Sequence, residues 1–183
     1  AQLLEHYRPE STLAFCNTKA QCRSLAAYLE SRGISALALH GDLEQRERED
    51  VLVQFANRSC SVLVATDVAA RGLDIDGLDA VINVEITPDA EVHIHRIGRT
   101  GRGEATGLAF SLCAQHEMRW ANEIEKYQGQ TIDWSNPKTL KPAPGGALRA
   151  PMITLCIQGG KKDKLRPGDL LGALTKDAGV AAD

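Results

Sequence analysis

Residues 61–75 read Ser-Val-Leu-Val-Ala-Thr-Asp-Val-Ala-Ala-Arg-Gly-Leu-Asp-Ile, and this stretch passes from an apolar run directly into a polar loop. Its first part, residues 61–65, has the length and composition of a buried β-strand. Further short apolar runs of the same kind occur at residues 13–16, 34–39, 80–84 and 107–112. Near-continuous apolar strands are typical of a parallel sheet that is covered on both faces.

Helical patterns alternate with these strands. Residues 18–32 carry apolar side chains at helical spacing, and Gly33 is placed to end that helix. Residues 43–56 and 115–127 repeat the pattern. The alternation predicts an α/β domain with helices on both faces of a parallel sheet. Ligands of such sheets bind beyond the carboxyl ends of the strands, so the segments of interest are residues 17–18, 40–42, 66–75 and 93–103.

The chain has 183 residues, of which 43% are hydrophobic and 25% are charged. This length exceeds that of one ordinary domain. The formal net charge is -3, so the bulk charge gives no argument for nucleic acid. Residues 138–183, however, contain eight Lys and Arg but only four Asp and Glu. This excess of positive charge indicates that the C-terminal segment binds a polyanion.

The five cysteines are scattered, and no Cys-x-x-Cys pair suggests zinc. His93 and His95 lie two residues apart, but no third ligand of suitable spacing accompanies them, so no metal site is predicted. Unpaired cysteines favour a reducing, cytoplasmic compartment. No apolar run is long enough to span a bilayer, so no membrane partner is expected. The chain does not begin with Met, and it is interpreted as a fragment of a longer protein.

Three units are predicted along the chain, because prolines and glycines break all periodicity after Trp134. Residues 1–135 form the α/β domain, residues 136–151 a Pro/Gly linker, and residues 152–183 a second unit. Within the second unit, residues 152–157 are predicted as a strand and residues 167–178 as a short amphipathic helix. One strand and one helix cannot form a core alone, so this unit is predicted to be truncated.

Residues 95–103, His-Arg-Ile-Gly-Arg-Thr-Gly-Arg-Gly, place an arginine at every third position. Guanidinium groups match phosphate oxygens, and the glycines let a phosphate or another backbone come close. The alternative interpretation is a solvated basic loop. In the 61–75 stretch, Thr66 is placed to donate to a phosphate and Asp74 to accept from a ribose hydroxyl. Here the alternative is ordinary turn chemistry.

Four stretches taken together resemble, in order and spacing, the motifs of DEAD-box RNA helicases. Residues 65–75 and 95–102 resemble motifs V and VI, and residues 13–18 resemble motif IV. Residues 45–48, Gln-Arg-Glu-Arg, resemble the QxxR motif and follow a His40-Gly41-Asp42 turn. Several ordered motifs are far more specific than one glycine-rich match. The resemblance covers residues 1–135 and implies the C-terminal RecA-like domain of such an enzyme; the motif wording argues against a superfamily-2 enzyme that acts on DNA.

The resemblance implies that ATP binds between two RecA-like domains and that RNA lies across both. The chain has no GxxxxGK[ST] loop, so the phosphate cradle and the Mg²⁺ ligands are expected in the N-terminal RecA-like domain. Arg99 and Arg102 are expected to act as arginine fingers, and with Gly72 and Asp74 they form the expected nucleotide site. The residues expected to contact the RNA backbone are Asn17, Gly41, Asp42, Arg48 and Thr66. The residues expected to couple the two domains are Arg71, His95 and Arg96.

The tail resembles the linker and the first part of the RNA-binding domain in the DbpA subgroup of this family. Such domains resemble the RRM fold and recognise ribosomal RNA, which implies a role in ribosome biogenesis. No aromatic residue lies between residues 152 and 160, so base stacking by this strand is not expected. Lys161, Lys162 and Lys164 are expected either to contact phosphates or to keep a loop soluble.

The function that the resemblance implies is the second half of an ATP-dependent RNA helicase, which remodels RNA by ATP hydrolysis. The alternative is a non-catalytic module that only docks RNA or ribosomal particles. Because half of the shared site is expected elsewhere, the chain alone is expected to fold but neither to hydrolyse ATP nor to unwind RNA.

Overall fold

The computed structural model describes residues 1–73, 75, 77–101, 106–157 and 159–180. A single sheet of parallel strands has the order β2-β3-β1-β4-β5. The strands are β1 (Thr12–Phe15), β2 (Ala36–Leu39), β3 (Val62–Ala65), β4 (Ala80–Asn83) and β5 (Leu108–Ser111). The pairing register brings their last residues to one level, so their carboxyl ends share one edge of the sheet. The predicted parallel sheet is confirmed.

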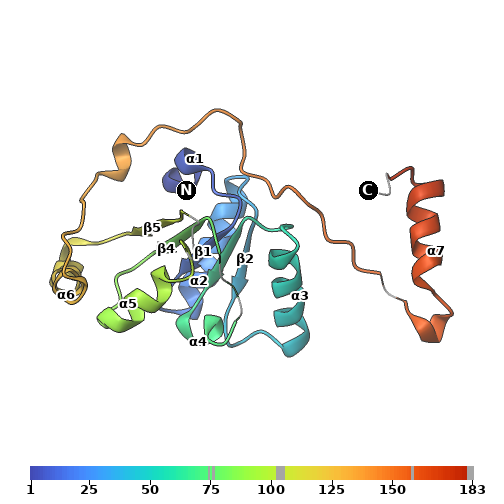
Figure 1. Ribbon diagram of the computed structural model, residues 1–183, viewed down its shortest axis with the longest axis horizontal. Helices are drawn as coiled ribbons and strands as arrows, with labels where there is room; N and C mark the ends of the chain where they lie inside the picture. The colour runs from blue at the N-terminus through green and yellow to red at the C-terminus, as the bar shows by residue number, and fades with distance from the viewer. Residues whose placement is uncertain (74, 76, 102–105, 158, 181–183) are drawn as a thin grey trace.

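Helices follow most of the strands (Figure 1). They are α1 (Gln2–Tyr7), α2 (Lys19–Ser31), α3 (Gln45–Ala56), α4 (Asp67–Ala70), α5 (Ala90–Ile97), α6 (Met118–Gln128) and α7 (Pro167–Gly172). Short 3₁₀ turns lie at Gln115–Glu117, Pro137–Thr139 and Lys161–Asp163, and a π-helical turn at Ala173–Asp177 extends α7. Figure 1 shows α7 lying apart from the sheet.

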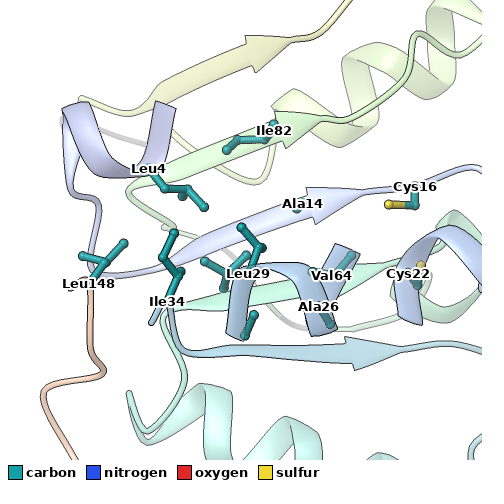
Figure 2. Packing of buried hydrophobic residues seen from close by; sticks show 12 residues of the cluster. Leu4, Ala14, Cys16, Cys22, Ala26, Leu29, Ile34, Val64, Ile82 and Leu148 are labelled. Carbon is teal, nitrogen blue, oxygen red and sulfur yellow. The ribbon is translucent and has the colours of Figure 1, made fainter. Parts of the chain in front are cut away.

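Alternate residues of the central strands pack on opposite faces of the sheet. Ala14 and Val64 join one core cluster with Leu29 of α2 (Figure 2), whereas Leu13 and Leu63 join the other cluster, which includes the α3 residue Phe55. A strand that is buried on both sides must be apolar at successive positions. This is why the central strands read as uninterrupted apolar runs.

Polar side chains start the helices that leave the carboxyl edge. Thr18 caps α2 by accepting from the Gln21 backbone N–H, and Thr66 caps α4 in the same way through Ala69. The Asp89 carboxylate accepts from the N–H groups of residues 91 and 92 at the start of α5. Capping of this kind satisfies backbone donors that have no partner within the helix. The same polar residues that end the strands therefore fix the direction of the chain at this edge.

Several predicted boundaries differ from the structure. Helices α1, α4 and α5 were not predicted, and the segment of interest at residues 93–103 begins inside α5. The strand predicted at residues 152–157 is wrong, because these residues form no regular element and Ile153 is 85% exposed. A strand needs a neighbour for its backbone hydrogen bonds. The described part of the chain offers this segment no ladder.

Residues 141–154, which we call the strap, run across the domain although they were predicted as a linker and the start of the tail. The Nδ1–H of His6 donates to the Lys141 carbonyl at 2.6 Å, and the Ala143 N–H donates to the Glu5 carbonyl at 2.9 Å. Farther along, the Ser35 N–H donates to the Leu148 carbonyl at 3.2 Å. A bond of 2.7 Å between the hydroxyls of residues 59 and 154 closes the series. The strap is thus docked on the domain.

Leu148 anchors the strap in the hydrophobic core. Its side chain is 7% exposed and joins the cluster that contains Leu4, Leu29 and Ile34 (Figure 2). The neighbouring Ala147 approaches so closely that a Cβ on Gly33 would lie 3.1 Å from the Cβ of Ala147. Gly33 has a φ of +76°, which also favours glycine there. A Pro/Gly segment therefore contributes to the core of the preceding domain.

We expect Leu148→Ala to lower the free energy of unfolding of the chain by about 2–3 kcal/mol, because it leaves a cavity at the rim of the core. Urea denaturation followed by circular dichroism measures the change. Leu171→Ala is the matched control, since Leu171 is exposed and its loss should change stability by less than about 0.5 kcal/mol. Equal effects of the two variants would show that the strap is not docked in solution.

Candidate active site and RNA-facing edge

The carboxyl edge of the sheet gathers the polar residues that follow the strands. Asn17 lies just after β1, Gly41 and Asp42 after β2, Thr66 after β3 and Glu85 after β4. Since the strands end at one level, these residues lie along one edge although they are far apart in the sequence. The edge predicted from the order of the elements is the edge that the structure forms.

Arg96, on α5, holds this edge together. Its guanidinium forks onto Asp67, with Nε to Oδ1 and Nη2 to Oδ2 both at 2.7 Å. Nη2 also donates to the Asn17 Oδ1 at 3.0 Å, and Nη1 donates at 3.3 Å to the Asn83 side chain and to the Glu85 carbonyl. The Arg96 side chain is only 2% exposed. Its burial is stabilised because each of its five N–H groups donates to an acceptor. We call this set the Arg96 cluster: Arg96, Asp67, Asn17, Asn83 and Glu85.

The guanidinium of Arg96 thus lies inside this domain, against residues after three different strands. It also lies 5.1 Å from the ring centroid of Phe15. Arg96 was expected, with Arg71 and His95, to couple this domain to a second one. Arg96 is buried in this domain, whereas Arg71 and His95 are exposed. Asp67 and Asn83 were not predicted as site residues from the sequence. Their signal was weak, because an Asp after a strand and an Asn at a strand end are both common.

A hollow of about 340 Å³ opens beside the Arg96 cluster. It is lined by Phe15, Asp67, Ala70, Arg71, Val92, His95, Arg96 and Arg99. Arg99 is held there by a bond of 3.1 Å from its Nη1 to the Leu73 carbonyl. The hollow therefore brings together residues of the 61–75 and 95–103 stretches, and three of its lining side chains are arginines.

The remaining residues of the expected nucleotide site lie in the same loops. Gly72 has a φ of +75°, and among the described residues no atom lies within 4 Å of the position that its Cβ would take. Asp74 and Arg102 lie outside the described residues. The structure thus describes two of the four residues expected to bind nucleotide, Gly72 and Arg99.

The turn after β2 carries a group of charges. Asp42 accepts a hydrogen bond from Lys19, and its Oδ2 lies 3.3 Å from the Nη1 of Arg23. The hydrogen bond from Lys19 lowers the pKa of the Asp42 carboxyl below its ordinary value. Gly41 is exposed, and the Lys19 Cε is 3.9 Å from where its Cβ would lie. Lys19 and Arg23, which were not predicted as site residues, both pair with the Asp42 carboxylate.

Arg48 and Thr66 make contacts within the domain. The Nη2 of Arg48 donates to the Ala69 carbonyl at 2.7 Å, which ties α3 to α4. The Thr66 hydroxyl oxygen accepts from the Ala69 N–H at 3.4 Å, and the residue is 9% exposed. Both side chains therefore fix the loop that follows β3. Asn17, in contrast, is exposed while its amide oxygen is held by Arg96.

The tail lysines lie beyond the strap. Lys162 and Lys164 are exposed, and the backbone around them turns back so that Gly160 N–H donates to the Asp163 carboxylate at 2.9 Å. The side chain of Lys161 lies outside what the structure describes. These lysines are distant in the chain from the Arg96 cluster, and among the described residues no hydrogen bond or ion pair joins the two.

A second cavity, of about 730 Å³, lies between β5, α6 and the segment that follows α6. Trp134 lines it and is half exposed, so it does not cap the core as a chain-end tryptophan often does. His93 also lines it, and burial, with a smaller effect of the Arg96 charge, lowers the pKa of this imidazole. The walls are largely apolar and do not resemble a polyanion site.

No group of three or more His, Cys, Asp or Glu side chains is arranged to hold a metal ion in the described parts of the chain. Across residues 1–73, 75, 77–101, 106–157 and 159–180, no helix has the length and apolarity needed to cross a membrane. All five cysteines are free thiols.

The model of the helicase conserved C-terminal domain family matches residues 1–104. The chain belongs to this family. The matched residues contain the Arg96 cluster and the hollow beside it, and the RecA-like fold expected from the motifs is confirmed. A second family model, that of the DbpA RNA binding domain, matches residues 154–183. It begins at the last residue of the strap.

Similar proteins agree with this assignment. The ATP-dependent RNA helicase DbpA of Escherichia coli is 53% identical over 179 residues, which cover 98% of this chain and 39% of that protein. Its Bacillus subtilis namesake is 34% identical, covering 96% of this chain and 41% of the relative. The E. coli DEAD-box protein SrmB, solved bound to the regulator of ribonuclease activity A, superposes with a TM-score of 0.71 at 31% identity over 82% of this chain and 86% of that one. The chain spans about two fifths of the length of the two helicases named DbpA.

Proposed function

We propose that this chain is the second RecA-like domain of an ATP-dependent RNA helicase, followed by the first part of an RNA-binding tail. One observation carries the proposal: the Arg96 cluster binds together residues after β1, β3 and β4 and lies beside a hollow that holds Arg99. The hollow suits a phosphorylated ligand, because the guanidinium groups of Arg71 and Arg99 line it and guanidinium groups match phosphate oxygens. ATP hydrolysis and RNA remodelling belong to the whole protein and are part of the proposal.

ATP with Mg²⁺ is the proposed cofactor, and the residues around the hollow fit the phosphate end of a nucleotide. Arg99 and Arg102 supply positive charge to the transferred phosphoryl group, and Gly72 and Asp74 hold the nucleoside side. Asp67 lines the hollow, and each of its carboxylate oxygens accepts a hydrogen bond from Arg96. The Mg²⁺ ligands are proposed to lie in the N-terminal RecA-like domain.

The proposal gives the three coupling residues two different tasks. Arg71 and His95 are exposed at the hollow and reach the N-terminal RecA-like domain. Arg96 is a positioning residue, because its Nη2 donates to the Asn17 Oδ1 at 3.0 Å and thereby orients the exposed Asn17 side chain. A movement of Arg96 would thus change both the proposed nucleotide site, which it lines, and the proposed RNA contact at Asn17.

RNA is the proposed substrate, gripped by its backbone along the carboxyl edge. Asn17, Gly41, Asp42, Arg48 and Thr66 form or support that edge, with Lys19 beside Gly41 as a further cation. Backbone contacts position RNA without reading its bases. Specificity is assigned to the tail, including Lys161, Lys162 and Lys164. The DbpA RNA binding domain match supports RNA binding by the tail. Ribosomal RNA as the target, and a role in ribosome biogenesis in the cytoplasm, are part of the proposal.

The proposal is tested by comparing RNA-stimulated ATP hydrolysis by the full-length protein and by this 183-residue chain. We expect turnover only in the full-length protein, because the chain supplies one side of a shared site. ATP turnover by the purified chain above a no-protein control would contradict the shared site. A full-length protein that binds RNA but never hydrolyses ATP would favour the non-catalytic docking module.

A further inference from the structure

The strap crosses the domain at the edge opposite the Arg96 cluster. Its contacts fall on Ser35 and Ser59, which precede β2 and β3, and on α1. The proposed RNA and nucleotide residues instead follow the strands. In Figure 1 the strap passes over α1 and continues beyond β2 and α3 toward the tail. It is therefore a separate surface of the same domain.

The strap belongs to a stretch without acidic residues. No Asp or Glu occurs between Asp133 and Asp163, while Lys138, Lys141 and Arg149 occur before the tail lysines. This local excess of positive charge contrasts with the formal net charge of -3 for the whole chain. A stretch of like charge in an otherwise acidic protein favours a polyanionic partner.

Three cations along the strap lack a counter-ion within the residues that the structure describes. Lys141 and Arg149 are exposed and have no carboxylate partner there. Arg8 donates from Nη1 to the Gly146 carbonyl at 2.8 Å, which holds the strap but leaves the guanidinium charge unbalanced. Nearby cations are different, since Arg32 pairs with Glu5 and Arg58 pairs with Glu10.

Docking fixes the backbone on which these cations stand. Arg149 follows directly after the buried Leu148, and Lys141 is held through its carbonyl by His6. Cations on a fixed backbone lose less conformational entropy on binding than cations on a free linker. A merely soluble spacer would not need a residue of its own in the hydrophobic core. The combination of an anchored backbone and unbalanced charge therefore points to a ligand.

We propose that the strap, with Arg8, Lys141 and Arg149, is a second contact surface for the RNA phosphate backbone. It lies between the helicase domain and the segment that the DbpA RNA binding domain model matches from residue 154. RNA held by the tail thus meets a fixed positive surface before it reaches the carboxyl edge. The inference rests on the proposed function only for the identity of the ligand, which is RNA rather than another polyanion.

The test is the salt dependence of RNA binding by the full-length protein, with labelled polyuridine as the probe and fluorescence anisotropy as the readout. Each phosphate contact on single-stranded RNA contributes about 0.7 to the slope of log K against log salt. We expect Lys141→Ala/Arg149→Ala to reduce the slope by about 1.4. The matched control is Arg119→Ala/Lys126→Ala, which removes the same charge from exposed positions of α6 and should keep the wild-type slope.

Further variants separate charge from structure. Arg149→Lys keeps the cation, so the wild-type slope is expected, whereas loss of slope in this variant would overturn a purely electrostatic contact. A wild-type slope in Lys141→Ala/Arg149→Ala would overturn the strap as an RNA surface. That result would leave the shared ATP site untouched, because the site is tested by hydrolysis and not by the salt slope.

Discussion

In the full-length protein, Arg99→Ala is expected to lower RNA-stimulated ATP turnover by about 10³–10⁵-fold while RNA binding persists. Arg99 lines the hollow, where its Nη1 donates to the Leu73 carbonyl, and its proposed role there is to stabilise a phosphoryl group. A finger of this kind stabilises charge that develops in the transition state, which corresponds to about 4–7 kcal/mol of the barrier. Steady-state phosphate release at saturating RNA and ATP measures the loss.

Two companion variants give this experiment its controls. Arg119→Ala removes an exposed arginine from α6, outside the hollow, and should leave turnover near the wild-type value. Arg99→Lys keeps the charge but loses the planar fork, so turnover should stay well below the wild type. Unchanged turnover in Arg99→Ala would refute its role as a finger. A parallel loss of RNA affinity and turnover would instead indicate that Arg99 acts through the fold or through RNA.

The carboxyl edge could be predicted from the sequence because apolar strands and polar strand ends alternate regularly. Asn17 and Thr66 each follow an uninterrupted apolar run, and parallel strands must bring such residues to one edge. The chain order of the strands does not reveal their order in the sheet, however. The central position of β1 between β3 and β4 is what brings Asn17 beside Asp67 and Asn83.

Burial of Arg96 could not be predicted from the local sequence. The arginine spacing in residues 95–103 suggested side chains that converge on a ligand, whereas α5 turns Arg96 inward and leaves His95 exposed. The acceptors that stabilise the buried guanidinium come from Asn17, Asp67 and Asn83, up to 79 residues away in the chain. Only the packed domain brings these acceptors together.

Local sequence patterns failed in two opposite ways: they missed a core contact of the strap, and they predicted a strand that does not form. Prolines and glycines correctly indicated a segment without helix or strand, but they concealed Leu148, a lone apolar residue that packs in the core. The apolar run at residues 152–157 suggested a strand, yet strand formation requires a partner that the described chain does not provide. In both cases the deciding contact is non-local.

Replacing Arg96 should have the largest effect on the stability of the domain. Arg96→Ala removes a fully bonded, buried guanidinium and leaves Asp67, Asn83 and Asn17 without their donor. Breaking a buried ion pair from one side costs about 3–5 kcal/mol. The lower value is expected here, because the Asp67 side chain is 34% exposed and water can partly replace the lost donors. Urea denaturation of the chain, followed by circular dichroism, measures the difference.

Arg71→Ala is the matched control, because Arg71 is an exposed arginine of the same hollow and its loss should change stability by less than about 0.5 kcal/mol. Arg96→Lys should recover only part of the lost stability, since an ammonium group cannot fork onto both oxygens of Asp67 while it also reaches Asn17. If Arg96→Ala unfolded at the wild-type urea concentration, the Arg96 cluster would not hold the strand ends together. If it unfolded early but Arg96→Lys matched the wild type, charge alone would suffice, and the forked geometry that aligns Asn17 would be dispensable.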